Sequence, residues 1–282
     1  MYSPKEYWSS LAKRSSDPTD DSAFAPILHP LAPPWFNHII DDLQFRAVRR
    51  ALSIAAMPPG ARFLDVGCGT GRWIRRYQTL GFSPVGLDAT IGMLQLARAR
   101  NTQAPLITGL SQSLPFADST FDGLSDITVV QHIPYEVQSK ALSEMVRVLK
   151  PGGRMILMEV ICRTDSGDDH DSHVFPREPR DWISEVERCG VSLIEWFGQE
   201  YLLADRLYVR LARSLFGRKS NLVNRVRSAA ISVEMAESSF YHRLYWRMRY
   251  ITVHLSAWSE PVVAKICPRF LSTHGIFVFR KQ

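Results

Sequence analysis

The sequence predicts an α/β fold in which helices cover both faces of a largely parallel sheet. Short apolar segments alternate with helical segments of about 10–15 residues, as expected of parallel strands joined by crossover helices. A turn containing Gly67, Gly69 and Gly71 follows the first of these apolar segments directly. Apolar residues make up 45% and charged residues 22% of the 282-residue chain, enough to bury one large α/β core or two small ones.

Several segments have the features of strands, because each is short and apolar and is bounded by glycine, proline or polar residues. In chain order they are 62–66, 83–88, 106–109, 123–130, 154–161, 191–197 and 275–280. Pro151-Gly152-Gly153 is expected to turn the chain just before the fifth of them.

Helical spacing of apolar residues predicts the intervening helices. They are 4–14, 35–56, a helix through Trp73 and Tyr77 that stops at Gly81, then 91–100, 135–149 and 181–189. Before the last strand, leucines recur every four residues from Leu203 to Leu215, and a 3–4 spacing continues from Val226 to Met248. This region therefore predicts a helical insert.

We divide the chain into four parts. Residues 1–60 form an N-terminal helical lid, 61–201 a cofactor-binding α/β core, 202–271 a basic helical insert over the acceptor site, and 272–282 the final strand of the core sheet.

Charge is distributed unevenly along the chain. Residues 1–201 hold 20 Lys and Arg against 24 Asp and Glu, whereas residues 202–282 hold 14 against only 4. A basic last third suggests an anionic substrate, a membrane surface or a nucleic acid as partner, or simply a solvated helical face. Arg206, Arg210, Arg213, Arg243, Arg247 and Arg249 are the candidates for anion binding.

Cysteine spacing and hydropathy indicate the compartment. Cys68, Cys162, Cys189 and Cys267 lie far apart and form no C-x-x-C pair, so neither a zinc site nor a disulfide framework is expected. No apolar run approaches the roughly 18 residues of a membrane span, and Met1–Ser10 has no apolar signal region. We expect a cytoplasmic protein, with its oligomeric state open.

The glycine turn and the second strand together indicate a nucleoside-type ligand. Glycines let the backbone approach a ligand closely, and the first N–H groups of the following helix point into the same site. The spacing is G-x-G-x-G, with Arg72 where a dinucleotide fingerprint has its last glycine, and Asp65 precedes the turn. Asp88 closes the second strand, where a carboxylate can accept both hydroxyls of a ribose.

Longer motifs point to a family. FLDVGCGTGRW, GLDAT, SLPFADSTFDGL, VVQHI and SEMVRVLKPGGRMIL follow one another between Ala61 and Ile161. In this order they resemble the class I S-adenosylmethionine-dependent methyltransferases of the small-molecule type, and residues 182–197 and the closing HGIFVFRK match more loosely. The resemblance implies a Rossmann-like sheet of seven strands, mostly parallel with the last strand antiparallel. It also implies S-adenosyl-L-methionine as cofactor, lying over the carboxyl ends of the early strands.

The resemblance assigns cofactor contacts position by position. Asp65 would lie near the amino group of the methionine moiety, and Asp88 would hold the ribose hydroxyls. The other implied contacts are Gly67, Cys68, Gly69 and Gly71 along the turn, Ala89 and Met93 beside the sugar and adenine, Leu110, Ser111 and Gln112 around the adenine, and Ile127 through its backbone. The family often has an acid or amide at position 110, so here main-chain groups or Gln112 must contact the adenine. Tyr7, Trp8 and Arg46 are candidates for lid or carboxylate contacts.

Candidate bases follow the fourth and fifth strands. A hydroxyl acceptor needs a base, whereas an amine or carbanion-forming acceptor needs less help. His132, Asp126 and Glu159 are the candidates, and each has a structural alternative as a turn cap or a hydrogen-bonded buried group. The loop 164–177 is rich in Asp and His but matches no ligand pattern, so we expect an acidic lid and no metal site.

These observations favour a methyltransferase that acts on an O or N atom of a small polar or anionic molecule, such as a glycan or a natural-product intermediate. The alternative is a lipid or quinone methyltransferase that contacts membranes peripherally through its basic helices. A nucleic-acid substrate is not expected, because the chain has no motif of the N/D-P-P-Y type and no recognisable binding module. A non-catalytic cofactor-binding subunit remains a further alternative.

Overall fold

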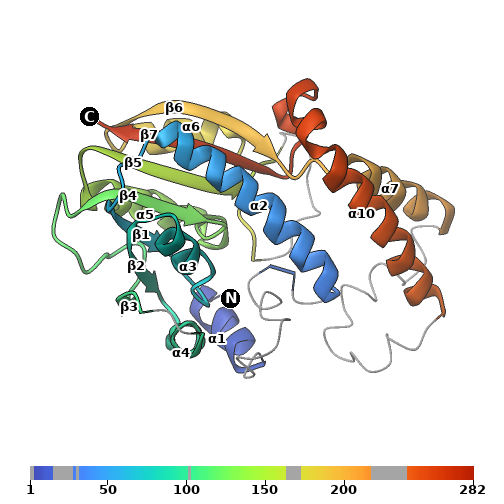
Figure 1. The fold of residues 1–282 in the computed structure, drawn as a ribbon, viewed down its shortest axis with the longest axis horizontal. Coiled ribbons are helices and arrows are strands. Elements are labelled where there is room, and N and C mark those ends of the chain that lie inside the picture. Colours follow the sequence, from blue (N-terminus) through green and yellow to red (C-terminus); the bar gives the residue numbers. More distant parts are fainter. Residues whose placement is uncertain (1–2, 15–27, 30–31, 101–102, 163–172, 217–239) are drawn as a thin grey trace.

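A computed structural model describes residues 3–14, 28–29, 32–100, 103–162, 173–216 and 240–282 (Figure 1). Its strands are β1 (Arg62–Val66), β2 (Ser83–Asp88), β3 (Leu106–Thr108), β4 (Phe121–Ile127), β5 (Leu149–Val160), β6 (Val191–Gln199) and β7 (His274–Lys281). They form one sheet of seven strands in the order β3-β2-β1-β4-β5-β7-β6. Only β7 is reversed, because it pairs antiparallel with both β5 and β6. The predicted mostly parallel sheet with a reversed last strand is confirmed.

The sheet lies inside the molecule, with apolar side chains on both faces. Along β5, Met155, Ile156, Leu157 and Met158 are all fully buried. Successive side chains of a strand point to opposite faces, so a continuous apolar run is expected only where both faces are covered. Ile156 and Met158 accordingly pack in one core cluster and Met155 and Leu157 in the other.

Helices cover the two faces in chain order. They are α1 (Pro4–Arg14), α2 (Pro34–Ala55), α3 (Arg72–Thr79), α4 (Ile91–Ala99), α5 (Tyr135–Val148), α6 (Pro179–Glu187), α7 (Leu203–Phe216) and α10 (Phe240–Ile266), with short 3-10 turns at Val130–His132 and Arg269–Leu271. Side chains of α2 and α3 pack on the face that carries Ile156, and side chains of α5 and α6 pack on the opposite face.

The two described helices of the predicted N-terminal lid cover different surfaces. The apolar side of α2, including Val48 and Ala51, packs directly against β5 and β7, so this helix is a layer of the core. In contrast, α1 packs on α4 through Leu11, Ala12 and Met93. Helical periodicity identified both helices but could not show which surface each one covers.

The insert between β6 and β7 contains α7 and α10, which pack against each other and reach the rest of the molecule through α2 (Figure 1). Arg249 of α10 forms a buried ion pair with Asp205 of α7 at 2.6 Å. The second predicted helix was expected from Val226, but its first part lies outside the described residues. In the structure α10 continues to Ile266, well beyond the predicted end at Met248.

One turn was misplaced. Pro151-Gly152-Gly153 lies inside β5, which begins at Leu149. Phe121 pairs with Leu149 before a register shift, and pairing resumes between Gly123 and Arg154. The proline and glycines therefore form an irregularity within the strand, which bends without ending.

Candidate functional site

A cavity of about 460 Å³ opens at the carboxyl ends of β1, β2 and β4. Its walls come from the glycine turn, the segments that follow β2, β3 and β4, and the first turns of α1. Ligands of open α/β sheets bind at this edge, where adjacent crossovers diverge. The cavity therefore lies where the sequence predicted the cofactor.

The glycine turn brings its backbone into direct contact with the segment after β4. Gly67 has a φ of +66°, and a Cβ atom at this position would lie 2.4 Å from Cγ2 of Val129. Any side chain here would therefore either displace Val129 or strain the backbone. Both residues line the cavity, so the absent side chain sets the shape of its wall.

Asp88 supports the turn and reaches the cavity at the same time. Its Oδ2 accepts the backbone N–H of Gly69 at 2.9 Å, and its Oδ1 accepts that of Thr90 at 2.8 Å. Burial raises the pKa of this carboxyl, while the two backbone N–H groups oppose the rise. A carboxylate in this position can still accept hydroxyl groups from a ligand, which suits the predicted ribose contact.

Asp65 lies immediately behind the turn. Its Oδ1 accepts the hydroxyl of Ser125 at 2.9 Å, whereas its Oδ2 is buried without a hydrogen-bond partner. Burial raises the pKa of Asp65 to about 7. The hydroxyl of Thr70 in the same turn is also buried and unpartnered. Unsatisfied buried polar atoms are uncommon in native proteins, and here they fit a polar, cationic ligand group such as the amino group of S-adenosylmethionine.

The segment after β4 carries backbone strain. Thr128 has a φ of +60°, which is unfavourable for a β-branched residue, and it lines the cavity. Its N–H donates to the carbonyl of Met158 at 2.8 Å. The strain directs the chain into the short turn Val130–His132, which places His132 beside the cavity.

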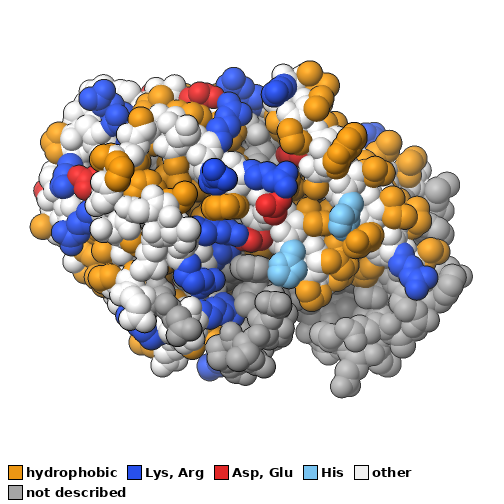
Figure 2. Space-filling model, viewed as in Figure 1, with side chains coloured by type: hydrophobic (Ala, Val, Ile, Leu, Met, Phe, Trp, Pro, Cys, Tyr) orange, Lys and Arg blue, Asp and Glu red, His pale blue; other side chains and the backbone are white. Residues whose placement is uncertain are grey.

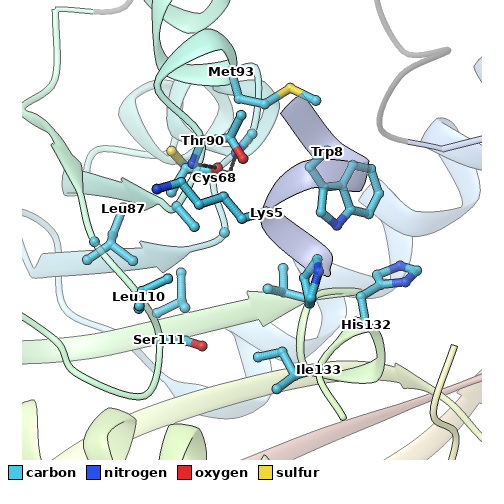
Figure 3. A pocket seen from close by; sticks show the side chains of 18 of the residues that line it. Lys5, Trp8, Cys68, Leu87, Thr90, Met93, Leu110, Ser111, His132 and Ile133 are labelled. Carbon is cyan, nitrogen blue, oxygen red and sulfur yellow. Dashed lines mark hydrogen bonds between the residues drawn. The ribbon is translucent and has the colours of Figure 1, made fainter. Parts of the chain in front are cut away.

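His132 is held as a neutral imidazole. Its Nδ1 lies 3.0 Å from the carbonyl oxygen of His173, and burial lowers its pKa to about 4. Trp8 meets the His132 ring edge-on at 5.1 Å, and Tyr7 stacks on His173 at 4.6 Å. Figure 3 shows Trp8 and His132 together on one side of the cavity, across from Leu110 and Ser111. The first helix thus closes the cavity by packing on the His132 side.

Asp126 and Glu159 occupy structural positions. Both side chains are fully buried, and neither lines the cavity. Asp126 accepts the N–H groups of Val129 and Val130, while Glu159 accepts these two and that of Gln131 at 3.0–3.2 Å. Burial raises the pKa of both carboxyls, and Asp126 raises that of Glu159 further. Their geometry corrects the expectation of bases here, because both groups hold the backbone that carries His132.

Most of the predicted cofactor contacts meet at the cavity. Those that line it are Gly67, Cys68, Gly69, Asp88, Ala89, Met93, Leu110, Ser111, Gln112 and Ile127. Asp65 and Gly71 do not line it: the first lies behind the turn, and the second begins α3 with a φ of +74°. Burial raises the pKa of the Cys68 thiol, which therefore stays protonated.

The structure adds residues that the sequence did not single out. Lys5 and Trp73 line the cavity, as do Ile133 and Val137 from the segment entering α5 (Figure 3). Arg72 lines it too, but its guanidinium is buried and donates to Asp41 at 2.7 Å and to Gln44 at 2.9 Å. The apolar periodicity of α5 was a usable signal for Val137, whereas nothing in the sequence brings Lys5 to this site.

The basic insert does not roof the cavity in the described structure. No described residue of 202–271 lines it, whereas the first turns of α1 do, so the described part of the insert is not a wall of the predicted acceptor site. Arg206 donates to the carbonyl of Leu271 and to Thr273, and Arg249 pairs with Asp205. Arg210 and Arg247 are exposed, while the side chains of Arg213 and Arg243 lie outside the described ones. Arg46 pairs with Asp42 on the surface and also lies away from the cavity.

Most of the Asp- and His-rich loop predicted as an acidic lid, residues 163–172, lies outside the described residues. Within the described parts of the chain, no group of three or more His, Cys, Asp or Glu residues is arranged to hold a metal ion.

The sequence profile of a family described as "Methyltransferase domain" matches residues 64–157, the segment that builds the glycine turn, Asp88 and the turn carrying His132. Residues 64–157 therefore form a methyltransferase domain, and the sheet around them has the fold of the class I S-adenosylmethionine-dependent methyltransferases. The cofactor of this family is S-adenosyl-L-methionine, and the cavity walls and the unpartnered Asp65 oxygen fit it.

Named relatives of this methyltransferase are similar over part of their length. It is 36% identical over 124 residues to a demethylmenaquinone methyltransferase of Renibacterium salmoninarum. The aligned region covers 44% of this chain and 52% of that protein. A demethylmenaquinone methyltransferase of Symbiobacterium thermophilum is 35% identical over 198 residues, covering 64% of this chain and 66% of that one. The match thus spans about half the length of the first of these curated relatives.

Solved structures confirm the fold of this methyltransferase. A structure from Galdieria sulphuraria matches with a TM-score of 0.57 at 17% identity, covering 100% of this chain and 99% of that one. At this identity the likeness concerns the fold alone.

Proposed function

We propose that this protein transfers the methyl group of S-adenosylmethionine to a lipophilic aromatic acceptor of the quinol class. The observation that carries the proposal is the apolar character of the cavity wall beside His132. Trp8, Val129, Ile133 and Val137 line that wall. Apolar pockets with few polar groups bind flat, lipophilic molecules, because burial of apolar surface drives their binding.

The named relatives support the same acceptor class. Both bacterial proteins described above are named demethylmenaquinone methyltransferases, and the acceptor in that name is a quinone. The polar or anionic acceptor favoured by the sequence depended on arginines of the insert, and none of these residues with a described side chain lines the cavity. The quinone alternative therefore becomes the leading proposal.

The residues that would hold the cofactor are those of the glycine turn and the end of β2. Asp88 would accept the ribose hydroxyls, Met93 and Leu110 would enclose the adenine, and Asp65 would balance the charge of the amino group. When bound, S-adenosylmethionine supplies an activated methyl group on a positively charged sulfur. The chain itself has to orient the acceptor and exclude water, and orientation of this kind can contribute about 7–11 kcal/mol.

His132 is the candidate to accept a proton from the acceptor, at Nε2, where the acceptor hydroxyl would replace the amide of Gln131 as the donor. Its low pKa makes it a weak base at neutral pH, so it suits an acceptor that releases its proton readily. A quinol hydroxyl meets this requirement better than an alcohol of a glycan. An acceptor of this class partitions into lipid bilayers, so we also propose a cytoplasmic protein with peripheral membrane contact.

A labelling assay tests the proposal. The purified protein would receive methyl-labelled S-adenosylmethionine with a reduced naphthoquinone that bears a short isoprenoid chain, and in parallel with total tRNA and a glycan mixture. Label in the quinol product alone supports the proposal, whereas label only in tRNA or glycan contradicts it.

A matched pair of variants sharpens the assay. Val137→Asp, in the apolar wall, should raise KM for the quinol at least about tenfold, because a buried charge disfavours an apolar ligand. KM for S-adenosylmethionine should stay unchanged. Ile194→Asp, on the 43% exposed position of β6, is the control and should change neither constant.

A further inference from the structure

Helix α10 carries a continuous stripe of exposed apolar side chains. Met248, Ile251, Leu255, Trp258, Val262 and Ile266 are between 39% and 83% exposed, with Trp258 the most exposed of all. They recur at intervals of three and four residues, so they share one side of the helix and fall within an arc of about 80° at ~100° per residue. Soluble monomers rarely expose such a contiguous apolar surface without a partner.

The neighbouring helix extends this apolar surface. On α7, Leu207 is 60% and Leu211 52% exposed, and α7 packs along α10. Figure 2 shows hydrophobic side chains gathered over both helices on one face of the molecule. We call the exposed apolar residues of α7 and α10 the insert face.

The exposed charges that α7 and α10 place around the insert face have one sign. The only acidic residues of α7 and α10 are Asp205 and Glu260, and both are buried. Asp205 pairs with Arg249, and Glu260 accepts the backbone N–H of Tyr201 at 2.9 Å. At ~100° per residue, Arg247 and Lys265 lie at the edge of the apolar stripe, whereas Glu260 lies on the opposite side of α10. The solvent-facing charges beside the stripe are therefore cationic.

A second basic surface lies on the same side of the molecule. Lys and Arg side chains form a band over α2 and α3 next to the insert face (Figure 2). Arg46 and Arg50 of α2 are 60% and 53% exposed and pair with Asp42 and Glu195, and Arg75 and Arg76 of α3 line a shallow groove beside Phe45. An apolar helix face bordered by arginines and lysines matches the interfacial region of an anionic bilayer, where apolar groups insert and cations meet lipid phosphates.

We propose that the insert face docks this protein on anionic membrane surfaces, with the stripe of α10 entering the headgroup boundary. The proposal rests on the proposed function, since a quinol acceptor would be taken up from the same bilayer. A second copy of the chain is disfavoured as the occupant, because two cationic faces would repel each other. No helix in the described parts of the chain is long and apolar enough to cross a membrane, so the proposed attachment is to the surface.

Co-sedimentation with vesicles tests the proposal on the full chain. Vesicles of phosphatidylcholine with 30% phosphatidylglycerol should bind the protein, and vesicles of phosphatidylcholine alone should bind it at least about tenfold more weakly. Trp258→Glu should lower affinity for the anionic vesicles about tenfold or more, because an exposed indole that enters lipid is replaced by an anion. Arg247→Gln with Lys265→Gln should lower it about fivefold for each lost cation and flatten its salt dependence.

Controls separate this proposal from the proposed function. Ile194→Glu, at the 43% exposed position of β6, should bind vesicles like the wild type. Methyl transfer to a detergent-solubilised short-chain quinol should be unaffected by Trp258→Glu. If the wild-type protein does not methylate this quinol, the proposed function is refuted. The vesicle result is read separately and still tests the docking surface. Wild-type protein that ignores anionic vesicles overturns the inference. So does a concentration-dependent dimer in sedimentation velocity that Trp258→Glu dissociates without any vesicle binding.

Discussion

The side-chain amide of Gln131 donates to the ring nitrogen of His132 that carries no proton. Gln131 Oε1 accepts the backbone N–H of Val160 at 2.7 Å, which leaves its Nε2 facing His132 Nε2 at 3.2 Å. The carbonyl of His173 can only accept, so His132 Nδ1 must carry the hydrogen. Nε2 therefore keeps its lone pair on the side where Gln131 donates.

This arrangement predicts the titration of His132. Because burial lowers its pKa to about 4, the folded state binds this proton less tightly than the unfolded chain. The stability contributed by neutral His132 is complete above about pH 6.5 and is lost as pH falls through 4. Nitrogen-15 NMR at pH 7 should show the Nδ1–H tautomer, and Gln131→Leu should keep it, because the carbonyl of His173 still accepts from Nδ1–H. A signal that titrates near 6.5 in the wild type would refute this assignment.

Glu159 should prove structural. Glu159→Gln removes one acceptor from the backbone N–H groups of Val129–Gln131, so we expect it to lower the free energy of unfolding by about 1–3 kcal/mol. Methyl transfer should stay within a few fold of the wild type, measured as kcat on the quinol. A general base would instead cost about 100-fold or more, so such a loss in a stably folded variant would restore Glu159 to the chemistry.

The close contact between Gly67 and Val129 predicts a compensating pair. Gly67→Ala places a Cβ atom 2.4 Å from Val129 Cγ2 at a φ of +66°, and should cost about 1–3 kcal/mol in chemical denaturation. Adding Val129→Ala removes the clash and should recover part of that loss, leaving about 1–2 kcal/mol of backbone strain. If the changes in the free energy of unfolding caused by the two substitutions simply add, the contact between Gly67 and Val129 is not what destabilises Gly67→Ala.

Asp65 predicts a dependence of stability on pH. Burial raises its pKa from 3.8 to about 7, so the folded state holds this proton more tightly than the unfolded chain. Its stabilising contribution is complete below pH 3.8 and is lost as pH rises through 7. Without ligand, Asp65→Asn should raise the free energy of unfolding by at most about 4 kcal/mol at pH 8, from a pKa difference of roughly three, and should change it little at pH 4. A variant less stable than the wild type at pH 8 would contradict this.

The core of the fold was predictable because the residues that end its strands and helices are close to them in the sequence. Gly67 follows β1 directly, Gly60 and Gly81 lie two residues before β1 and β2, and both strands begin and end where the sequence placed them. The turn at Pro151-Gly152-Gly153 was wrong because pairing of Phe121 with Leu149 continues the sheet past it, and that contact is long-range. The partner of an amphipathic helix is also a tertiary property, which is why α2 was taken for part of a lid.

The parts of the candidate site that come from one short stretch of the sequence were predictable. The glycine turn and Asp88 belong to one strand–helix–strand unit, so their meeting follows from the fold. Asp126 and Glu159 were misjudged because an acid inside an apolar strand has the same pattern whether it faces a ligand or buried N–H groups. Lys5 reaches the cavity from a helix about 60 residues away, and composition gives no signal for that approach.

Calorimetry on the purified chain addresses the central claim, that a sulfonium nucleoside binds between the glycine turn and Asp88. S-adenosylmethionine and its demethylated product should each release heat in a one-to-one titration, and Asp88→Ala should weaken both at least about tenfold, since a charged hydrogen-bond partner is lost. Reduced pyridine nucleotide should give no heat. Heat from the pyridine nucleotide alone, or binding indifferent to Asp88→Ala, would contradict the account.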